Sequence, residues 1–431
     1  MNLSRRYTHH IRGVIDRLSR KYLVCIGLLF ATKAAAQGAR PAVPNTIQQD
    51  TALYGFFALL EQADSTVVNV LHLGDSHIQA GFLPVTTGEA LQKEFGNAGR
   101  GWVFPYNLAG TNGPDDYRWH STVRWKASRI IDRHKEADLG PGAIMITTTS
   151  ASPAVSYSAR QSRGPEDEVH TAQLFYDAGD TAGSVVAPGA QVTVTPAPFR
   201  GAATLCRATL EFPGTVQSFQ ARWDGGSSSA PFRFYGAILQ NGECGILYHA
   251  IGINGAQYQH YMESTGTLAA QLEVLQPQLI IISLGTNEAY SGQSAAAITA
   301  QMDSVVSLLR AQHPEAAILL TTPPECKRTV RRPYRKKVKG RYRTYYRTRY
   351  YTNPAIAMVT REIANYCRRE GLACWNFNAL NKAMAGSFAG GWARDHIHFN
   401  ARGYQLQGRL LYEALYKAYQ QYLEQKHGKD N

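Results

Sequence analysis

The fold is decided by Leu71-His72-Leu73-Gly74-Asp75-Ser76-His77, where an apolar strand pattern gives way to a helical one. Residues 65–70 just before it form a short apolar run rich in β-branched side chains, which predicts a buried strand. A helical pattern follows as far as Phe95. Ser76 is therefore expected where a strand ends and a helix begins, the place where open α/β sheets bind their ligands.

Two interpretations of Ser76 follow from this position. Free backbone N–H groups at a helix start favour a developing negative charge, so a serine there is well placed to be a nucleophile. The alternative is that Ser76 caps the helix while Gly74 and Asp75 make the turn. Residues near the C-terminus favour the first interpretation.

The first 36 residues have the order of a secretory signal. Basic residues precede an apolar run over residues 22–31, and Ala34-Ala35-Ala36 supplies a cleavage site of small residues. We predict a signal peptide over residues 1–36, cleavage near Ala36 and export. An amphipathic N-terminal anchor is the alternative.

The positive charge of the chain is concentrated in two segments. The 431 residues carry a net charge of +13, with 44% hydrophobic and 18% charged residues, a globular composition rather than a disordered one. Residues 1–36 hold seven basic residues and one acidic, and residues 327–349 hold twelve basic residues and none acidic. Removing these 6 and 12 net charges from +13 leaves about −5, so the basic character belongs to a local insertion.

Cysteine spacing predicts no metal site. Five cysteines follow residue 36, with no CxxC and no Cys/His spacing typical of zinc. Cys367 and Cys374 are close enough in sequence to pair, or to remain buried thiols. We expect neither a metal nor another cofactor.

The chain divides into an α/β region and an inserted β-region. Residues 37–116 and 235–431 alternate strand and helix patterns, and five strands are recognisable. This alternation predicts a small parallel sheet covered on both faces, a three-layer α/β/α fold. Residues 117–234 instead show short alternating runs between turn residues, which predicts an inserted β-sandwich.

A second candidate group of catalytic residues lies just before the last predicted helix, in Arg394-Asp395-His396-Ile397-His398. A serine nucleophile needs a base, and the base needs a carboxylate that fixes its tautomer. Ser76, His398 and Asp395 can fill these roles. His396 is a rival base, ranked lower because adjacent side chains in a turn point in different directions; a helix cap with a solvated histidine is the alternative.

Two further strand ends offer donors for an oxyanion. The strand over residues 279–284 leads to Asn287, which carries a side-chain amide, and the strand over residues 245–251 leads to Gly255, with Gly252 as its competitor. Together with the Ser76 N–H, these groups could hold a tetrahedral oxyanion, each donor contributing about 2.7–4 kcal/mol. Taken singly, each is also an ordinary turn residue.

In combination these segments resemble the SGNH (GDSL-type) hydrolase family. Four blocks occur in the family's order: Gly74-Asp75-Ser76-His77, the glycine best matched by Gly255, Gly285-Thr286-Asn287, and Asp395-x-x-His398. The resemblance covers the α/β region and implies the SGNH-hydrolase fold, a catalytic triad of Ser76, Asp395 and His398, and an oxyanion hole of Gly255 and Asn287. No Gly-x-Ser-x-Gly elbow occurs, which argues against the ordinary α/β-hydrolase fold.

Within that family, the chain looks similar to periplasmic O-acetylpeptidoglycan esterases. The similarity lies in residues 74–81, in the glycine-rich residues 95–101, and in Gly252-Ile253-Asn254-Gly255-Ala256-Gln257. It implies a periplasmic enzyme with an inserted carbohydrate-binding-like β-sandwich, an O-acetylated glycan as substrate and an acetyl-enzyme on Ser76. Alternatives are an esterase for another polysaccharide or a lipid, acetyl transfer, and a non-catalytic glycan-binding protein.

The basic insertion over residues 327–351 departs from those esterases. It alternates cationic residues and tyrosines around Gly340 and could form a projecting hairpin. Arginine and tyrosine together bind anions and stack on sugar rings. An anionic envelope polymer or a membrane surface is the expected partner rather than nucleic acid, with a solvated loop as the alternative.

Overall fold

The computed structural model of the protein describes residues 43–136, 139–160, 168–177, 184–196, 205–224 and 231–428. The predicted signal peptide over residues 1–36 lies outside these ranges. Within them, no helix combines the length and the apolar character needed to cross a membrane.

A six-stranded sheet in the order β1-β19-β16-β15-β2-β14 is the frame of the molecule. Its five parallel strands are β2 (Val67–Gly74), β14 (Gly245–Gly252), β15 (Leu279–Ser283), β16 (Ala317–Thr321) and β19 (Ala373–Trp375). The sixth, β1 (Ile47–Gln48), pairs antiparallel with β19. The sequence predicts only the five, because two residues are too few to show alternation.

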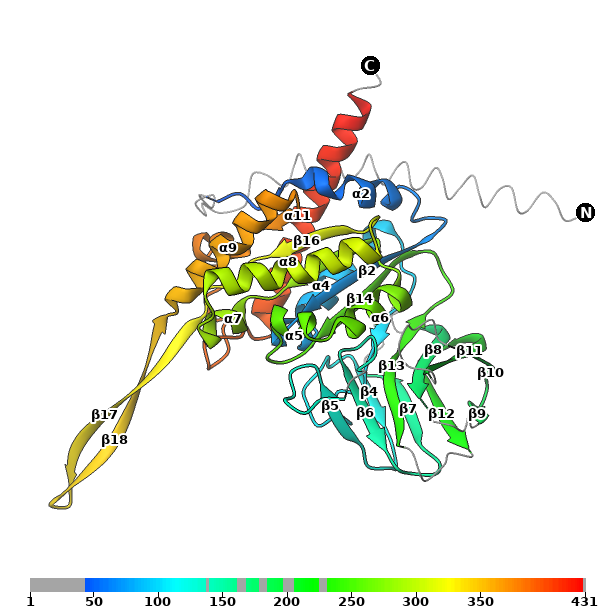
Figure 1. The fold of residues 1–431 in the computed structure, drawn as a ribbon, viewed down its shortest axis with the longest axis horizontal. Coiled ribbons are helices and arrows are strands. Elements are labelled where there is room, and N and C mark those ends of the chain that lie inside the picture. The colour runs from blue at the N-terminus through cyan, green and yellow to red at the C-terminus, as the bar shows by residue number, and fades with distance from the viewer. Residues whose placement is uncertain are drawn as a thin grey trace, which may run out of the picture. The chain divides into compact units, whose positions relative to one another are not determined.

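Helices cover both faces of this sheet (Figure 1). One face carries α2 (Tyr54–Leu60), α4 (Phe82–Phe95), α10 (Phe377–Ala383) and α11 (Ala401–His427), and the other carries α5 (Tyr258–Met262), α6 (Thr265–Leu275), α7 (Thr286–Ser291), α8 (Ala295–Gln312) and α9 (Pro354–Glu370). Strand residues alternate between the two cores: Leu279 and Ile281 enter one, Ile280 and Ile282 the other. The predicted three-layer fold is confirmed.

The first helical segment of the α/β region changes type along its length. The segment begins as a 3₁₀ turn, Asp50–Leu53, and becomes α-helical only at Tyr54. The segment has no side-chain N-cap, and its first residue follows Gln49 in a left-handed conformation. A tight first turn is a common way to begin a helix without a cap.

The β-region forms two packed sheets, as predicted. The first sheet has the strand order β10 (Gln191–Pro196), β11 (Leu205–Val216), β8 (Val169–Asp177), β13 (Phe232–Gln240), β6 (Ile144–Thr148), β5 (Lys126–Arg129). Strand β3 (Gly101–Val103) also pairs with β13. The second sheet has the order β4 (Tyr117–His120), β7 (Ala154–Ala159), β12 (Ser218–Asp224), β9 (Ser184–Val186). Buried Trp119 of β4 meets Phe234 of β13 across the sandwich, with ring centroids 5.6 Å apart. Strand β13 continues to Gln240, past residue 234 where the sequence suggests the insertion ends.

The basic insertion forms a two-stranded hairpin, as the sequence suggests. Strands β17 (Lys327–Val338) and β18 (Arg341–Thr352) pair along their whole length. Lys339 and Gly340 both have positive φ, 50° and 78°, as a tight two-residue hairpin turn requires. Figure 1 shows this hairpin projecting away from the helices around the main sheet.

Candidate active site

Ser76 lies at the carboxyl edge of the main sheet. Strand β2 ends at Gly74, and α3 (Ser76–Gln79) begins two residues later. Asp75 is the N-cap of this short helix and its carboxylate accepts a hydrogen bond from the His77 N–H at 2.9 Å. Capping therefore falls to Asp75, and the Ser76 hydroxyl remains available for another partner.

That partner is His398. The Ser76 Oγ lies 2.8 Å from His398 Nε2, across 322 positions of sequence. His398 Nδ1 lies 2.7 Å from Asp395 Oδ2. These distances allow a proton to pass from the hydroxyl to the ring while the carboxylate holds the opposite ring nitrogen.

Asp395 is organised to remain ionised. Its second oxygen accepts hydrogen bonds from the backbone N–H groups of Ile397 and His398 at 2.9 and 3.0 Å. Partial burial alone raises the pKa of Asp395, but the hydrogen bonds from the His398 ring and from these two N–H groups outweigh it and lower that pKa. The side chains of His398 and Asp395 are 34% and 46% exposed, so a substrate can reach them.

His396, the rival base, has a different environment. Its backbone has φ +56°, and its ring packs against Tyr350 of the hairpin with the centroids 4.2 Å apart. The ring that contacts Ser76 is that of His398. With a left-handed backbone at His396, the side chains of His396 and His398 point in different directions.

Asn287 lies beside Ser76, but its amide is already engaged. The Asn287 Nδ2 donates to Asp75 Oδ2 at 3.1 Å and to the Ala256 carbonyl at 3.0 Å. Asn287 and Ser76 line the same pocket. An oxyanion bound there would have to draw one of these two N–H groups away from its present acceptor.

The two candidate glycines differ in what constrains them. A Cβ on Gly252 would lie 2.1 Å from the backbone nitrogen of Gln79, so Gly252 is needed for the close packing of β14 on α3. Gly255 has φ +85° and more open surroundings, its nearest contact for a Cβ being Ile131 at 3.6 Å. The residue of this loop that lines the Ser76 pocket is Asn254. Gly255 is the next residue of this loop, but it is not among the residues that line the pocket.

The pocket has a volume of about 540 Å³, within the range typical of ligand sites. Its lining comes from several strand ends and from the last loop: Ser76, Asn112, Asn254, Asn287, Tyr290 and His398, among others. A second hollow of about 730 Å³ shares Phe82 and Ala401 with it. The two hollows therefore adjoin, and the surface beside Ser76 extends well beyond the size of a small ester.

Three buried polar residues next to the site, His77, Asp75 and Glu288, had no role in the chemistry assigned to them from the sequence. His77 bonds Tyr404 OH at 2.9 Å, and its ring lies 5.2 Å from that of His398. Burial lowers the pKa of His77 to about 3, so this ring stays neutral beside the candidate base. Burial raises the pKa of Asp75 and that of Glu288 to about 7 each.

Glu288 also ties two elements of the site together. Its Oε1 accepts from the Tyr258 N–H at the start of α5, at 2.8 Å, while its buried Oε2 has no partner within the described part of the chain. A buried, half-satisfied carboxyl is easier to maintain when it is protonated. A sequence signal for it was lacking, because a glutamate after Asn287 resembles any exposed helix residue.

The buried Cys326 thiol supports the loop of His398 by donating to the Ile397 carbonyl at 3.3 Å. Within the described residues no disulfide joins any of the five cysteines Cys206, Cys244, Cys326, Cys367 and Cys374, and the last three are buried. In the ranges that the structure describes, no group of three or more His, Cys, Asp or Glu side chains is arranged to hold a metal ion. Of the two alternatives for Cys367 and Cys374, the structure has the buried thiols.

Residues 218–406 match the model of the GDSL-like lipase/acylhydrolase family. The matched segment contains Gly255, Asn287, Asp395 and His398 and begins after Ser76, which the parallel sheet brings to them. Residues 218–406 are thus similar to the GDSL-like (SGNH) acylhydrolases, a class of carboxylic ester hydrolases.

Among solved structures, one described as a peptidoglycan O-acetylesterase is similar over 88% of this chain and 99% of its own, with a TM-score of 0.66 and 20% identity. A putative platelet activating factor from Streptococcus pneumonia matches over 39% of this chain and 73% of its own, with a TM-score of 0.31 and 17% identity. An acetylxylan esterase from Geobacillus stearothermophilus matches over 40% and 73%, with a TM-score of 0.29 and 13% identity. No curated protein matches the chain in sequence. The first of these similarities supports the fold, including its inserted β-region.

Proposed function

We propose that this protein is a serine esterase that removes O-acetyl groups from a cell-envelope carbohydrate, with peptidoglycan as the favoured polymer. The observation that carries the proposal is the continuous hydrogen-bonded chain from Ser76 through His398 to Asp395. The resemblance of the full α/β and β-region arrangement to a structure described as a peptidoglycan O-acetylesterase supports this substrate class.

In the proposed reaction, Ser76 Oγ attacks the acetyl carbonyl carbon while His398 Nε2 takes the hydroxyl proton. The bond between the carbonyl carbon and the sugar oxygen then breaks, and His398 returns the proton to that oxygen. Acetyl-Ser76 is left, and a water activated by His398 releases acetate and restores the serine. Asp395 keeps the ring in the required tautomer and stabilises its charged form.

The oxyanion of the tetrahedral intermediate would be held by the Ser76 N–H, the Asn287 amide and the Gly255 N–H. Asn287 carries a side-chain donor in the pocket that Ser76 lines. Its bond to Asp75 is the one it can most readily give up, because an acidic group with a pKa of about 7 is a weaker acceptor when protonated.

A polymeric substrate is consistent with the long surface beside Ser76 and with the inserted β-region. The two adjoining hollows beside Ser76 give a surface longer than one acetylated sugar needs. We assign residues 37–116 and 235–431 to the catalytic region and residues 117–234 to a carbohydrate-binding-like domain. Export through a signal peptide over residues 1–36 would bring the enzyme to the periplasm, where such a polymer is found.

Acetate release tests the proposal. O-acetylated peptidoglycan, acetylated xylan and an acetylated capsular polysaccharide are incubated with wild type and with Ser76→Ala. For wild type we expect the largest kcat/KM on peptidoglycan. The Ser76→Ala variant should release no acetate from any of the three polymers. Preference for xylan or capsule would move the substrate to another polysaccharide, and preference for long-chain nitrophenyl esters would move it to lipids.

A further inference from the structure

The hairpin β17–β18 presents a continuous cationic face. Antiparallel pairing puts opposite residues on the same face, and the register pairs Arg332 with Arg347 and Lys336 with Arg343. Arg328, Arg349 and Arg341 fall on this same face by alternation along the strands. Seven of the twelve cations in residues 327–349 therefore lie on one side of a ribbon about 40 Å long.

This arrangement is unfavourable for the hairpin by itself. Like charges directly opposite one another destabilise a strand pair, and an isolated two-stranded ribbon is marginal in water. The hairpin contains no acidic residue that could neutralise them. Both strands are exposed over almost their whole length, so no core compensates for the repulsion.

Tyrosines fill the spaces between the cations. On the cationic face, the rings of Tyr334 and Tyr345 stack with centroids 5.8 Å apart, and the Arg347 guanidinium lies 5.5 Å from the Tyr334 ring. Tyr342 and Tyr346 on the opposite face are 67% and 58% exposed. Flat exposed rings beside planar guanidinium groups match a ligand that carries both sugar rings and carboxylates.

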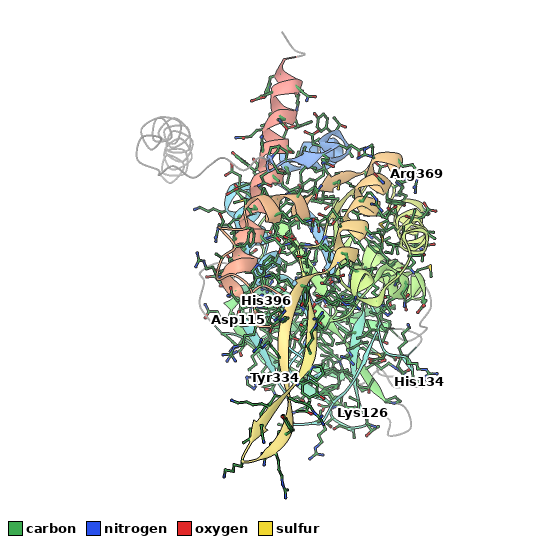
Figure 2. All side chains as sticks on the ribbon, turned by 90° about the vertical axis from the view of Figure 1, so that its left-hand side faces the viewer. Asp115, Lys126, His134, Tyr334, Arg369 and His396 are labelled. Atoms are coloured by element: carbon green, nitrogen blue, oxygen red, sulfur yellow. The ribbon has the colours of Figure 1, made fainter. Side chains whose placement is uncertain are left out.

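The hairpin begins at the rim of the active site. The Lys327 N–H donates to the His396 carbonyl at 2.9 Å, and the Tyr350 hydroxyl donates to the Arg394 carbonyl at 3.1 Å. Tyr290, which lines the Ser76 pocket, donates to the Lys327 carbonyl at 2.6 Å. Figure 2 labels His396 at the root of the hairpin and Tyr334 farther along it.

We propose that the cationic face of β17–β18 binds a linear, carboxylate-bearing glycan and that this glycan is the same polymer whose esters Ser76 hydrolyses, an inference that rests on the proposed function. Hydrogen bonds connect the root of the hairpin to the loop that carries His398. A glycan bound along the ribbon therefore has its next sugars close to the pocket. Two weak contacts on one polymer then raise the effective concentration of esters at Ser76.

A membrane surface fits the hairpin less well. Elements that lie on membranes bury one apolar face and keep their cations on the other. Residues 327–352 contain no Leu, Ile, Met, Phe or Trp, and both faces of the ribbon carry cations and tyrosines. A narrow polymer can contact such a ribbon along its length, whereas a bilayer would be held by charge alone, without an inserted apolar face.

The test compares two variants of equal charge in the exported protein. In the first, Arg332, Lys336, Arg343 and Arg347 are replaced by Gln; in the second, the exposed residues Arg368, Lys382, Arg409 and Lys417 are replaced by Gln. Binding to O-acetylated peptidoglycan sacculi and to polygalacturonate is measured by cosedimentation and titration at rising salt, with neutral dextran and phosphatidylglycerol vesicles as comparison ligands.

We expect the first variant to bind sacculi and polygalacturonate about tenfold more weakly at low salt, as four exposed ion pairs would give, and the second to bind like wild type. The first variant should show a KM for acetate release from sacculi raised by a similar factor, with kcat/KM on 4-nitrophenyl acetate unchanged. The inference is overturned if both variants weaken equally, if neither weakens, or if wild type binds vesicles and not sacculi. Absence of acetate release by wild type would instead refute the proposed function, since cosedimentation does not depend on hydrolysis.

Discussion

The active site and the hairpin β17–β18 lie side by side and are built in opposite ways. Ser76, Asp75 and His398 are each held by hydrogen bonds between segments far apart in sequence, in or next to a dry core. Beyond its root at the loop of His396, the hairpin has only its own two strands, and most of its side chains are exposed. In the active site, ionisable side chains are hydrogen-bonded to a partner or kept neutral by burial. In the hairpin, many cations lie close together with no acidic residue among them.

This contrast separates chemistry from capture. Proton transfer needs fixed distances, which burial and multiple hydrogen bonds provide. Capture of a polymer needs many exposed contacts that tolerate different positions of the chain. We therefore expect changes at the site to alter turnover on every ester, and changes on the hairpin to alter only polymeric substrates.

The largest effect is expected for Ser76→Ala. Loss of the nucleophile should lower kcat by on the order of 10⁴-fold or more on both 4-nitrophenyl acetate and acetylated polymer. Steady-state rates on the two substrates measure this, with binding to sacculi as the control that should stay unchanged. Equal loss of binding would break the separation between the two regions.

A smaller effect is expected for Asp395→Asn. The amide can present its N–H₂ to His398 Nδ1 and so favour the wrong tautomer, which should lower kcat by about 10²–10⁴-fold. Because hydrogen bonds keep the pKa of Asp395 below its ordinary value, wild type should keep its carboxylate through the whole neutral range. Comparing kcat of the variant with wild type at neutral pH tests this; a change under threefold would show that His398 acts without it.

Asn287→Ala should follow, with kcat lower by about 10²–10³-fold if the amide reaches the oxyanion. The same substitution removes the bonds to Asp75 and Ala256, so a purely structural role would instead lower the melting temperature with kcat nearly intact. Thermal unfolding and single-substrate kinetics on the purified variant distinguish these two outcomes. Asn254→Ala, on the same pocket, is the matched control for loss of a lining amide.

The sequence was sufficient to predict the parallel sheet and the approach of His398 and Asp395 to Ser76. Strong apolar runs such as residues 279–284 are typical of buried strands, and Ser76 and Asn287 each follow the end of such a run within three residues. Asp395 and His398 could be paired because three residues of tight turn leave few other arrangements. Periodicity and turn residues also gave the hairpin, since Gly340 sits midway between two alternating runs.

What the sequence could not provide was the environment of each polar side chain. His396 and His398 are alike in sequence, and only the left-handed backbone at His396 decides which ring meets Ser76. Asp75 and Glu288 gain their character from almost complete burial, which the sequence around each of them does not indicate. The two hydrogen bonds that occupy the Asn287 amide could not be predicted either, because both acceptors, Asp75 and Ala256, follow other strands.

The smallest expected effect sharpens the buried side of the comparison. Glu288 has a folded pKa of about 7 against an ordinary value of 4.5, because burial disfavours its charge. The unfolded chain therefore loses this proton first as the pH rises from 4.5 to 7, and the folded state holds it longer. This group makes the free energy of unfolding fall over that window, by roughly 3 kcal/mol, with full stability only below pH 4.5.

Glu288→Gln removes this titration and keeps the shape and the acceptor for the Tyr258 N–H. The difference in unfolding free energy between variant and wild type should therefore shift in favour of the variant as the pH rises from 4.5 to 7, while kcat at neutral pH changes little. Denaturant unfolding of wild type and variant at several pH values measures it. A difference that stays constant with pH would mean that Glu288 is ionised in the folded protein, and that a buried charge lies beneath the catalytic groups after all.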